Sequence, residues 1–217
     1  MKLVERESPN QSARVHGDGA VRLIVCHTPE GDYEPTIRYL LTKGSQVSYH
    51  RLYKRDGSEA TQLVPFARKA WHAGPVNSLS DGLAIEGTAR TFDLAHPGTR
   101  QFARGVAERL VARDLPCQWT TDPGRGGFCR HGDLQADRSD PTPDLAEWRL
   151  FVGMVTDEHR KLTAPQPSWP RPLPRWWWEW NLWRIRGKKG PRPSSAPRVI
   201  PPWAWRRAKA FDRARRQ

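Results

Sequence analysis

The chain has little cysteine, little tyrosine and no long apolar run. Its 217 residues include 3 cysteines and 4 tyrosines, and hydrophobic residues make up 37% of it. Three cysteines do not make a disulfide framework; Cys117 and Cys129 flank a glycine-rich loop and could either pair or stay reduced. No apolar stretch approaches the ~20 residues of a membrane-spanning helix. The start of the chain also lacks the apolar core of a secretory signal. We therefore expect a protein made in the cytoplasm, with no signal peptide and no transmembrane helix.

Positive charge is concentrated towards the carboxyl end. The formal net charge is +13, and residues 165–217 hold 14 Lys and Arg against 2 Asp and Glu. The same residues hold 10 of the 20 prolines and 8 of the 11 tryptophans. A domain of roughly 150 residues buries enough surface to fold without covalent staples. The composition predicts a globular domain over 1–164 and a basic, Trp- and Pro-rich tail over 165–217.

Strand-like and helix-like segments alternate within residues 1–164. Apolar and β-branched runs predict strands at 21–27, 46–53, 59–64 and 82–86. Helix start and stop signals predict helices from Pro35 to Gly44, from Thr99 to just before Pro116, and from Thr142-Pro143-Asp144 through Val155. This alternation predicts an α/β fold with a mixed central β-sheet flanked by helices.

Three polar residues have the chemistry of a metal site. His27 ends the first predicted strand, at the edge where α/β sheets build their sites. His131 and Asp140 lie in one loop before the last predicted helix. Two imidazoles and a carboxylate leave a fourth position open, as in a catalytic rather than a structural zinc site. On spacing alone the three could equally be ordinary polar groups, and Cys129 is an alternative ligand.

Five motifs occur in an order that resembles a known family. They are His27 after its apolar strand, SYHRLYKRDGS at 48–58, AWHAG at 70–74, LAIE at 83–86 and HGDLQADRSDP at 131–141. Together they are similar to the zinc-dependent N-acetylmuramoyl-L-alanine amidases, which include phage endolysins and peptidoglycan-recognition proteins. The resemblance covers about residues 20–160 and not the tail. It implies the fold of that family, a Zn²⁺ cofactor and peptidoglycan as the substrate.

The resemblance also implies site roles. The residues that match the zinc ligands are His27, His131 and Asp140. Tyr49 matches a tyrosine beside the nucleophilic water in phage members, and Glu86 matches a general base in other members. Arg138 stands where the family usually has a lysine that stabilises the oxyanion.

Two further residues match the substrate cleft. His72 matches a histidine that lines the cleft, and Trp71 beside it would stack on a sugar.

Each role has an ordinary structural alternative, such as a core tyrosine for Tyr49 or a surface carboxylate for Glu86. In a strand over 47–53 neighbouring side chains point to opposite faces, so we take His50 as structural. Arginine keeps the charge of lysine but presents a planar fork, so Arg138 reaches its target differently.

These features predict a phage-type endolysin that cuts the bond between N-acetylmuramic acid and L-alanine. Such an enzyme would wait in the host cytoplasm until the membrane is breached. One alternative is a cytosolic amidase that recycles wall fragments, but a soluble fragment needs no basic anchor. Another is a binding module that has lost hydrolysis, which the retained ligand set argues against.

The tail is predicted to hold a monomeric enzyme to an anionic envelope polymer or membrane surface. In a helix, Trp176, Trp180 and Trp183 would share one face, with Trp177 beside them. Trp and Arg are both favoured at a headgroup interface, and a second basic segment at 203–216 would add avidity. The alternative is that the tryptophans pack back onto the domain. Nucleic acid would suit the same residues, as a side activity.

Overall fold

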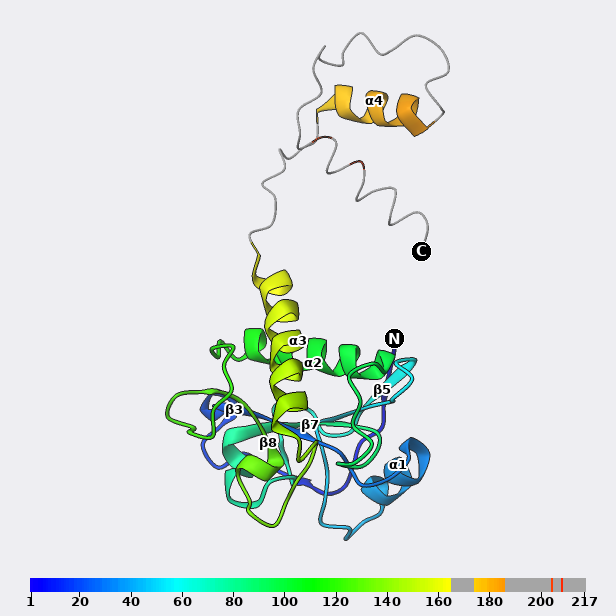
Figure 1. Ribbon diagram of the computed structural model, residues 1–217. Helices are drawn as coiled ribbons and strands as arrows, with labels where there is room; N and C mark the ends of the chain where they lie inside the picture. The colour runs from blue at the N-terminus through cyan, green and yellow to red at the C-terminus, as the bar shows by residue number, and fades with distance from the viewer. Residues whose placement is uncertain (165–173, 186–203, 205–207, 209–217) are drawn as a thin grey trace. The chain divides into compact units, whose positions relative to one another are not determined.

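The computed structural model describes residues 1–164, 174–185, 204 and 208. The chain divides into two units, Met1–Ala164 and Pro165–Gln217, and each is described by itself. Residues 1–164 form a six-stranded sheet in the order β1-β5-β4-β7-β3-β8 (Figure 1). β4 and β5 pair antiparallel, whereas the other neighbouring strands are parallel. The sheet is therefore mixed, as the sequence predicts.

The strands are short, and the central ones are buried. The main sheet contains β1 (Lys2–Glu5), β3 (Leu23–His27), β4 (Arg51–Tyr53), β5 (Glu59–Gln62), β7 (Ser80–Ile85) and β8 (Gly127–Arg130). A second, small sheet pairs β2 (Gln11–Ser12) with β6 (Lys69–Ala70). Three short 3-10 helices, η1 (Asp18–Ala20), η2 (Gly74–Leu79) and η3 (His131–Asp133), connect these elements. Every residue of β3 and β7 is buried, so these strands form the centre of the domain.

Helices cover both faces of the sheet. The long helices α2 (Pro97–Ala112) and α3 (Leu145–Thr163) pack on one face, and α1 (Tyr33–Leu41) lies on the other (Figure 1). Along β3, Ile24 and Cys26 join the α2–α3 core, whereas Leu23 and Val25 pack on the opposite side. Because strand side chains alternate, His27 shares the face of Leu23 and Val25 and points away from α2 and α3.

Most predicted boundaries differ from the structure by a few residues, and two differences have a clear cause. The strand expected over 46–53 is wrong in its first half, because the strand is confined to Arg51–Tyr53. The backbone N–H of Ser48 donates instead to the carbonyl of Trp71, and its hydroxyl donates to the carbonyl of Asn10. The helix expected from Pro35 begins at Tyr33. The strands β1, β2 and β6 carried no signal that the sequence analysis used.

A buried ion cluster joins β7 to α2. Asp81 is fully buried, and its carboxylate accepts hydrogen bonds from Arg14, Arg109 and Arg113. The guanidinium carbon of Arg109 also lies 3.7 Å from the centre of the Phe66 ring, which is a cation–π contact. One buried carboxylate therefore holds three cations together, which makes the folded state depend strongly on that single negative charge.

The second unit contains α4 (Arg175–Ile185). Trp177 and Trp180 are buried and pack with Ala204 and Ala208, whereas Trp178 is 46% exposed. The side chains of Trp177 and Trp180 therefore pack within this unit, and the binding of this segment to an envelope surface stays a prediction. The second basic segment, at 203–216, lies outside the described residues except for Ala204 and Ala208. Among the described helices, none combines the length and the apolar character that crossing a bilayer requires.

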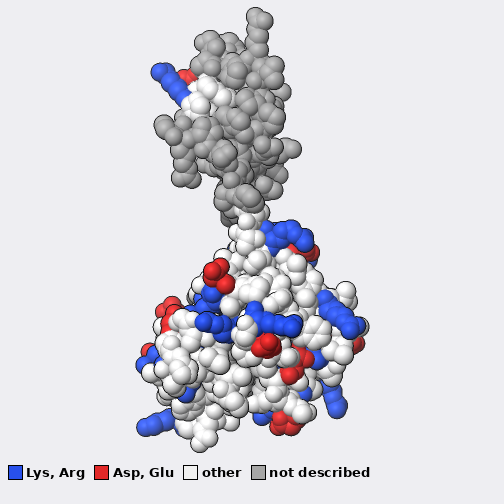
Figure 2. All heavy atoms as spheres, turned by 90° about the vertical axis from the view of Figure 1, so that its left-hand side faces the viewer, with Lys and Arg blue, Asp and Glu red and all other residues white. Residues whose placement is uncertain are grey.

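The surface charge and the thiols of the first unit follow from its composition and packing. Acidic and basic side chains are interspersed over the face of this unit shown in Figure 2. This agrees with the nearly equal numbers of acidic and basic residues in 1–164.

Cys26, Cys117 and Cys129 are all free. Burial raises the pKa of the Cys117 and Cys129 thiols, so both stay protonated near neutral pH.

Candidate metal centre

Three side chains meet at the carboxyl end of β3. His27 is the last residue of β3, and His131 follows directly after the neighbouring parallel strand β8. His27 Nδ1 lies 3.1 Å from Asp140 Oδ2, and His131 Nδ1 lies 3.1 Å from Asp140 Oδ1. The three candidate ligand atoms lie within 4.8 Å of one another, and all three residues are buried. The structure thus brings together the three residues that the sequence analysis singled out as metal ligands.

The loop that carries two of these residues is closed by its own hydrogen bonds. The backbone N–H of Gly132 donates to the carbonyl of Asp140 at 3.1 Å. The Arg130 guanidinium binds the Asp133 carboxylate at 2.6 Å and the Thr142 carbonyl at 2.9 Å. These bonds tie the start of the loop to its end, so Asp140 is held opposite His27.

The donor set fits a zinc ion. Gln135 Oε1 lies 2.9 Å from His131 Nε2, where it can accept a hydrogen. In the neutral tautomer with its hydrogen on Nε2, an imidazole has its lone pair on Nδ1, the atom that faces Asp140 in His131. Burial lowers the pKa of His27 to about 4, so this imidazole is neutral at pH 7. Burial alone would raise the pKa of Asp140, but the adjacent imidazoles of His131 and His27 hold it below its usual value. Neutral imidazoles and a carboxylate are ligands that zinc accepts, and a cation among them relieves their mutual repulsion.

Tyr49 and Arg138 lie beside this cluster. The Tyr49 ring centre is 5.0 Å from that of His27. Burial raises the pKa of the Tyr49 phenol, so it remains a hydrogen-bond donor at neutral pH. Arg138 belongs to the same loop as Asp140 and keeps about half of its side chain exposed. Its positive charge is among the influences that lower the pKa of His27.

Glu86 has hydrogen-bond partners of its own, away from the three ligands. Its Oε1 accepts the backbone N–H of Tyr33 at 3.0 Å, and its Oε2 accepts that of Arg55 at 2.9 Å. The first of these bonds satisfies a free N–H at the start of α1, which explains why that helix begins before Pro35. Both carboxylate oxygens of Glu86 therefore already hold backbone groups in place.

The two residues of the AWHAG motif have different surroundings. His72 is buried, and its Nδ1 lies 3.0 Å from Nε2 of His27. Trp71 is half-buried, and its Nε1 donates to Ser12 Oγ at 3.2 Å. The structure therefore places His72 next to a candidate ligand, whereas Trp71 packs towards β2.

Sequence reasoning missed two residues that support the cluster. Gln135 contacts His131, and Ser80 contacts His72. Gln135 lies four residues after His131, the spacing that joins side chains across one helical turn, and this was a usable signal. Ser80 had no such signal, because it reaches its partner through the fold.

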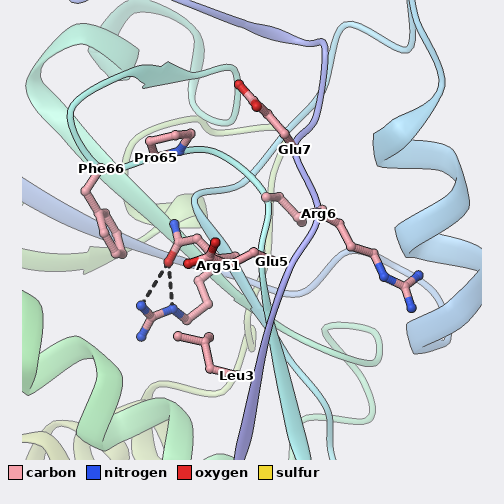
Figure 3. Close-up of a pocket in the computed structure, with 9 residues that line it drawn as sticks. Leu3, Glu5, Arg6, Glu7, Arg51, Pro65 and Phe66 are labelled. Atoms are coloured by element: carbon pink, nitrogen blue, oxygen red, sulfur yellow. Dashed lines mark hydrogen bonds between the residues drawn. The ribbon is translucent and has the colours of Figure 1, made fainter.

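Two hollows differ in their relation to the cluster. The pocket in Figure 3 lies at the sheet edge, and Arg51 on its wall donates to Gln62 Oε1 at 2.8 Å. None of the three candidate ligands lines it. A second groove, of about 230 Å³, is lined by Tyr49, whose ring lies next to His27, but by none of the three candidate ligands. Its lining is Pro29, Glu30, Gly31, Pro35, Thr36, Tyr39, Leu40, Val47 and Tyr49.

Sequence comparisons identify the family of this chain. Residues 17–143 match the N-acetylmuramoyl-L-alanine amidase family, and the chain belongs to that family. The 1,6-anhydro-N-acetylmuramyl-L-alanine amidase AmpD of Citrobacter freundii is 33% identical over 128 residues, which are 54% of this chain and 63% of AmpD. The N-acetylmuramoyl-L-alanine amidase A of Achromobacter lyticus is 33% identical over 66 residues, 30% of this chain and 37% of that protein. The chain thus spans less than two thirds of the length of these relatives.

Solved structures share the fold. The hydrolase AmiA of Staphylococcus aureus superimposes with a TM-score of 0.63 at 18% identity, covering 78% of this chain and 88% of AmiA. A mutant form of PlyL gives a TM-score of 0.55 at 19% identity, covering 72% of this chain and 99% of PlyL. The predicted α/β fold and the predicted family are confirmed, whereas the roles of individual residues remain predictions.

Proposed function

We propose that the protein is a zinc-dependent amidase that hydrolyses the bond between N-acetylmuramic acid and L-alanine in peptidoglycan. The convergence of His27, His131 and Asp140 in a member of this family is the observation that supports it. Bound there, zinc would polarise the scissile carbonyl and provide a nucleophile near neutral pH. Mass spectrometry of digested sacculi tests the reaction, because free stem peptides that begin with L-alanine identify the bond cut. New reducing sugar ends instead would overturn the proposal.

Other residues of the chain would divide the remaining work. In this proposal the phenol of Tyr49 would orient the attacking water, and the guanidinium of Arg138 would hold the developing oxyanion. Glu86 is the alternative general base, although its two oxygens already accept backbone hydrogens. The groove that Tyr49 lines offers the substrate a route to the cluster.

The two candidate proton handlers are expected to respond differently to substitution. Tyr49→Phe removes a hydroxyl beside the cluster, and we expect turnover to fall by about 10²-fold or more with the fold intact. Glu86→Gln keeps the shape of the side chain, but its amide nitrogen cannot accept a hydrogen, so one of the two bonds to backbone N–H groups is lost and the other is weakened. We expect this variant to lower stability by about 1–2 kcal/mol. Steady-state kinetics and thermal melts of both variants measure this. A larger loss of turnover in Glu86→Gln than in Tyr49→Phe would make Glu86 the general base.

Arg138 has its own test. We expect Arg138→Ala to lower kcat by about 10²-fold, since a lost oxyanion donor typically has that effect. Arg138→Lys restores the charge and should recover most of the rate. Arg90→Ala, at another exposed arginine, is the control and should change neither kcat nor KM. Equal kinetics for Arg138→Ala and the wild type would remove Arg138 from the reaction.

Two biological settings suit this chemistry. We propose lysis of an intact wall, as by an endolysin, because the tail carries 14 basic residues against 2 acidic ones. The similarity to AmpD supports a second candidate, the hydrolysis of soluble 1,6-anhydro-muropeptides during wall recycling. The ratio of kcat/KM on sacculi to that on soluble anhydro-muropeptides separates them. A module that binds peptidoglycan without hydrolysis would release peptide from neither.

The tail is proposed to bind an anionic envelope polymer or membrane surface without taking part in the chemistry. Truncation after Ala164 should therefore leave hydrolysis of soluble muropeptides unchanged and reduce binding to cells and anionic vesicles at least several-fold. Added salt should have the same effect on the full chain, because ~0.15 M salt screens exposed charges beyond about 8 Å. Co-sedimentation at two salt concentrations measures both. A truncated protein that unfolds, or loses activity on soluble substrate, would contradict this role.

A further inference from the structure

A line of buried hydrogen bonds runs from η2 to His27. Ser80 Oγ donates to the carbonyl of Val76 at 2.7 Å, so its single hydrogen is committed. Its oxygen must then accept from His72 Nε2, which lies 3.2 Å away. A neutral imidazole with its hydrogen on Nε2 has an acceptor at Nδ1. His72 Nδ1 lies 3.0 Å from His27 Nε2, so His27 is the donor in this last bond.

The direction of these bonds fixes which nitrogen of His27 carries a lone pair. With the hydrogen on Nε2, the lone pair is on Nδ1, the atom 3.1 Å from Asp140 Oδ2. Metal-binding histidines usually donate their second ring N–H to a supporting acceptor, which sets the tautomer and the ring orientation. In this chain the supporting acceptor is the imidazole of His72, and Gln135 does the same for His131.

The absence of a side chain at Gly82 in β7 makes room for the imidazole of His72. A Cβ atom at Gly82 would come within 2.5 Å of His72 Cγ and 2.6 Å of His72 Nδ1. The backbone N–H of His72 donates to Asn77 Oδ1 at 3.0 Å, which holds the residue from the other side. With 7% of its surface exposed, His72 lies behind His27 and outside the lining of the groove that Tyr49 lines.

We propose that His72 is a positioning residue for the metal ligand His27: held by Ser80 and seated against Gly82, it accepts the His27 Nε2 hydrogen and presents Nδ1 to the metal. The proposal rests on the zinc site of the proposed function and assigns His72 no contact with substrate. This role differs from the one that the family resemblance implies for His72, which is to line the substrate cleft.

Zinc affinity of the full-length protein, measured by competition with a fluorescent chelator, tests the proposal. The oxygen of asparagine can occupy the place of Nδ1, whereas glutamine extends its amide to the place of Nε2. We expect His72→Ala and His72→Gln to weaken zinc binding by about 10–100-fold, the usual effect of losing such a support. His72→Asn keeps the acceptor for His27 and should stay within about 3-fold of the wild type.

His50→Ala is the matched control. His50 is also a buried imidazole against Gly82, where its Nδ1 accepts the Gly82 N–H at 2.9 Å, and it contacts none of the three ligands. This variant should lose stability and keep its zinc affinity. Thermal melts of the metal-free proteins separate loss of fold from loss of metal binding, and the Asn and Gln pair decides the question if His72→Ala does not fold.

Two results would overturn the proposal. One is an unchanged zinc affinity in folded His72→Gln or His72→Ala; a raised KM at saturating zinc would then place His72 in the substrate cleft. The other is an equal loss of affinity in His72→Asn and His72→Gln, since the effect would not follow the acceptor. A wild-type protein that binds zinc but releases no stem peptide would refute the proposed function and leave the role of His72 intact.

Discussion

Replacing His27 or Asp140 by alanine is expected to abolish zinc retention and turnover together. Each variant leaves two of three protein ligands, and even the loss of a supporting hydrogen bond costs about 10–100-fold in affinity. We therefore expect zinc affinity to fall by far more than 100-fold and peptide release from sacculi to become undetectable. Metal analysis after dialysis and peptide release measure the two losses.

Cys129→Ala is the control for these ligand variants. Cys129 is the alternative ligand that the sequence offers, but its side chain is buried with Leu23 and Val25. This variant should keep its zinc and its activity, apart from a modest loss of stability. Chelation followed by zinc reloading should restore the wild type and not His27→Ala. A His27→Ala protein that retains one zinc per chain would show that the metal lies elsewhere.

Asp81→Ala is expected to destabilise the domain far more than the loss of an exposed charge. The substitution leaves Arg14, Arg109 and Arg113 around a site without its carboxylate, and breaking a buried ion pair costs about 3–5 kcal/mol. Asp18→Ala is the control, because Asp18 also pairs with Arg113 but has 53% of its side chain exposed. An exposed pair contributes at most about 1 kcal/mol.

Chemical denaturation of both variants tests this difference. Unfolding at a lower denaturant concentration, with an unchanged slope, reports the loss of stability directly. Equal losses in Asp81→Ala and Asp18→Ala would show that the three arginines do not need the buried carboxylate. Replacing the arginines one at a time should cost less than replacing Asp81, because each removal leaves the carboxylate two partners.

The candidate ligands were predicted from short motifs whose order resembles a known family, since spacing alone left them as ordinary polar groups. His27 ends an apolar run, and His131 and Asp140 share one short loop whose motif is readable without a structure. Cys26, the neighbour of His27 along β3, packs into the α2–α3 core on the opposite face, as the alternation of strand side chains requires. In these cases the evidence lies within a few residues of the site.

The features that were missed depend on contacts between distant parts of the chain. The support of His72 by Ser80 depends on the path of η2 over β7, and the cluster around Asp81 draws on Arg14 and Arg109, far away in sequence. The strand expected over 46–53 failed because Ser48 bonds to Asn10 and Trp71 instead of a neighbouring strand. Periodicity reports which face is apolar and not which distant partner a polar side chain meets.

Strand β7 carries residues of two different clusters at three consecutive positions. Ser80 and Gly82 serve the imidazole behind the candidate metal ligand, while Asp81 between them points to the opposite face and binds the arginines. A shift of this backbone by one residue would exchange the two faces. Under the proposed role of His72, substitutions at Ser80 and Gly82 would act on the metal ligand, and substitution of Asp81 between them would act on the stability of the fold.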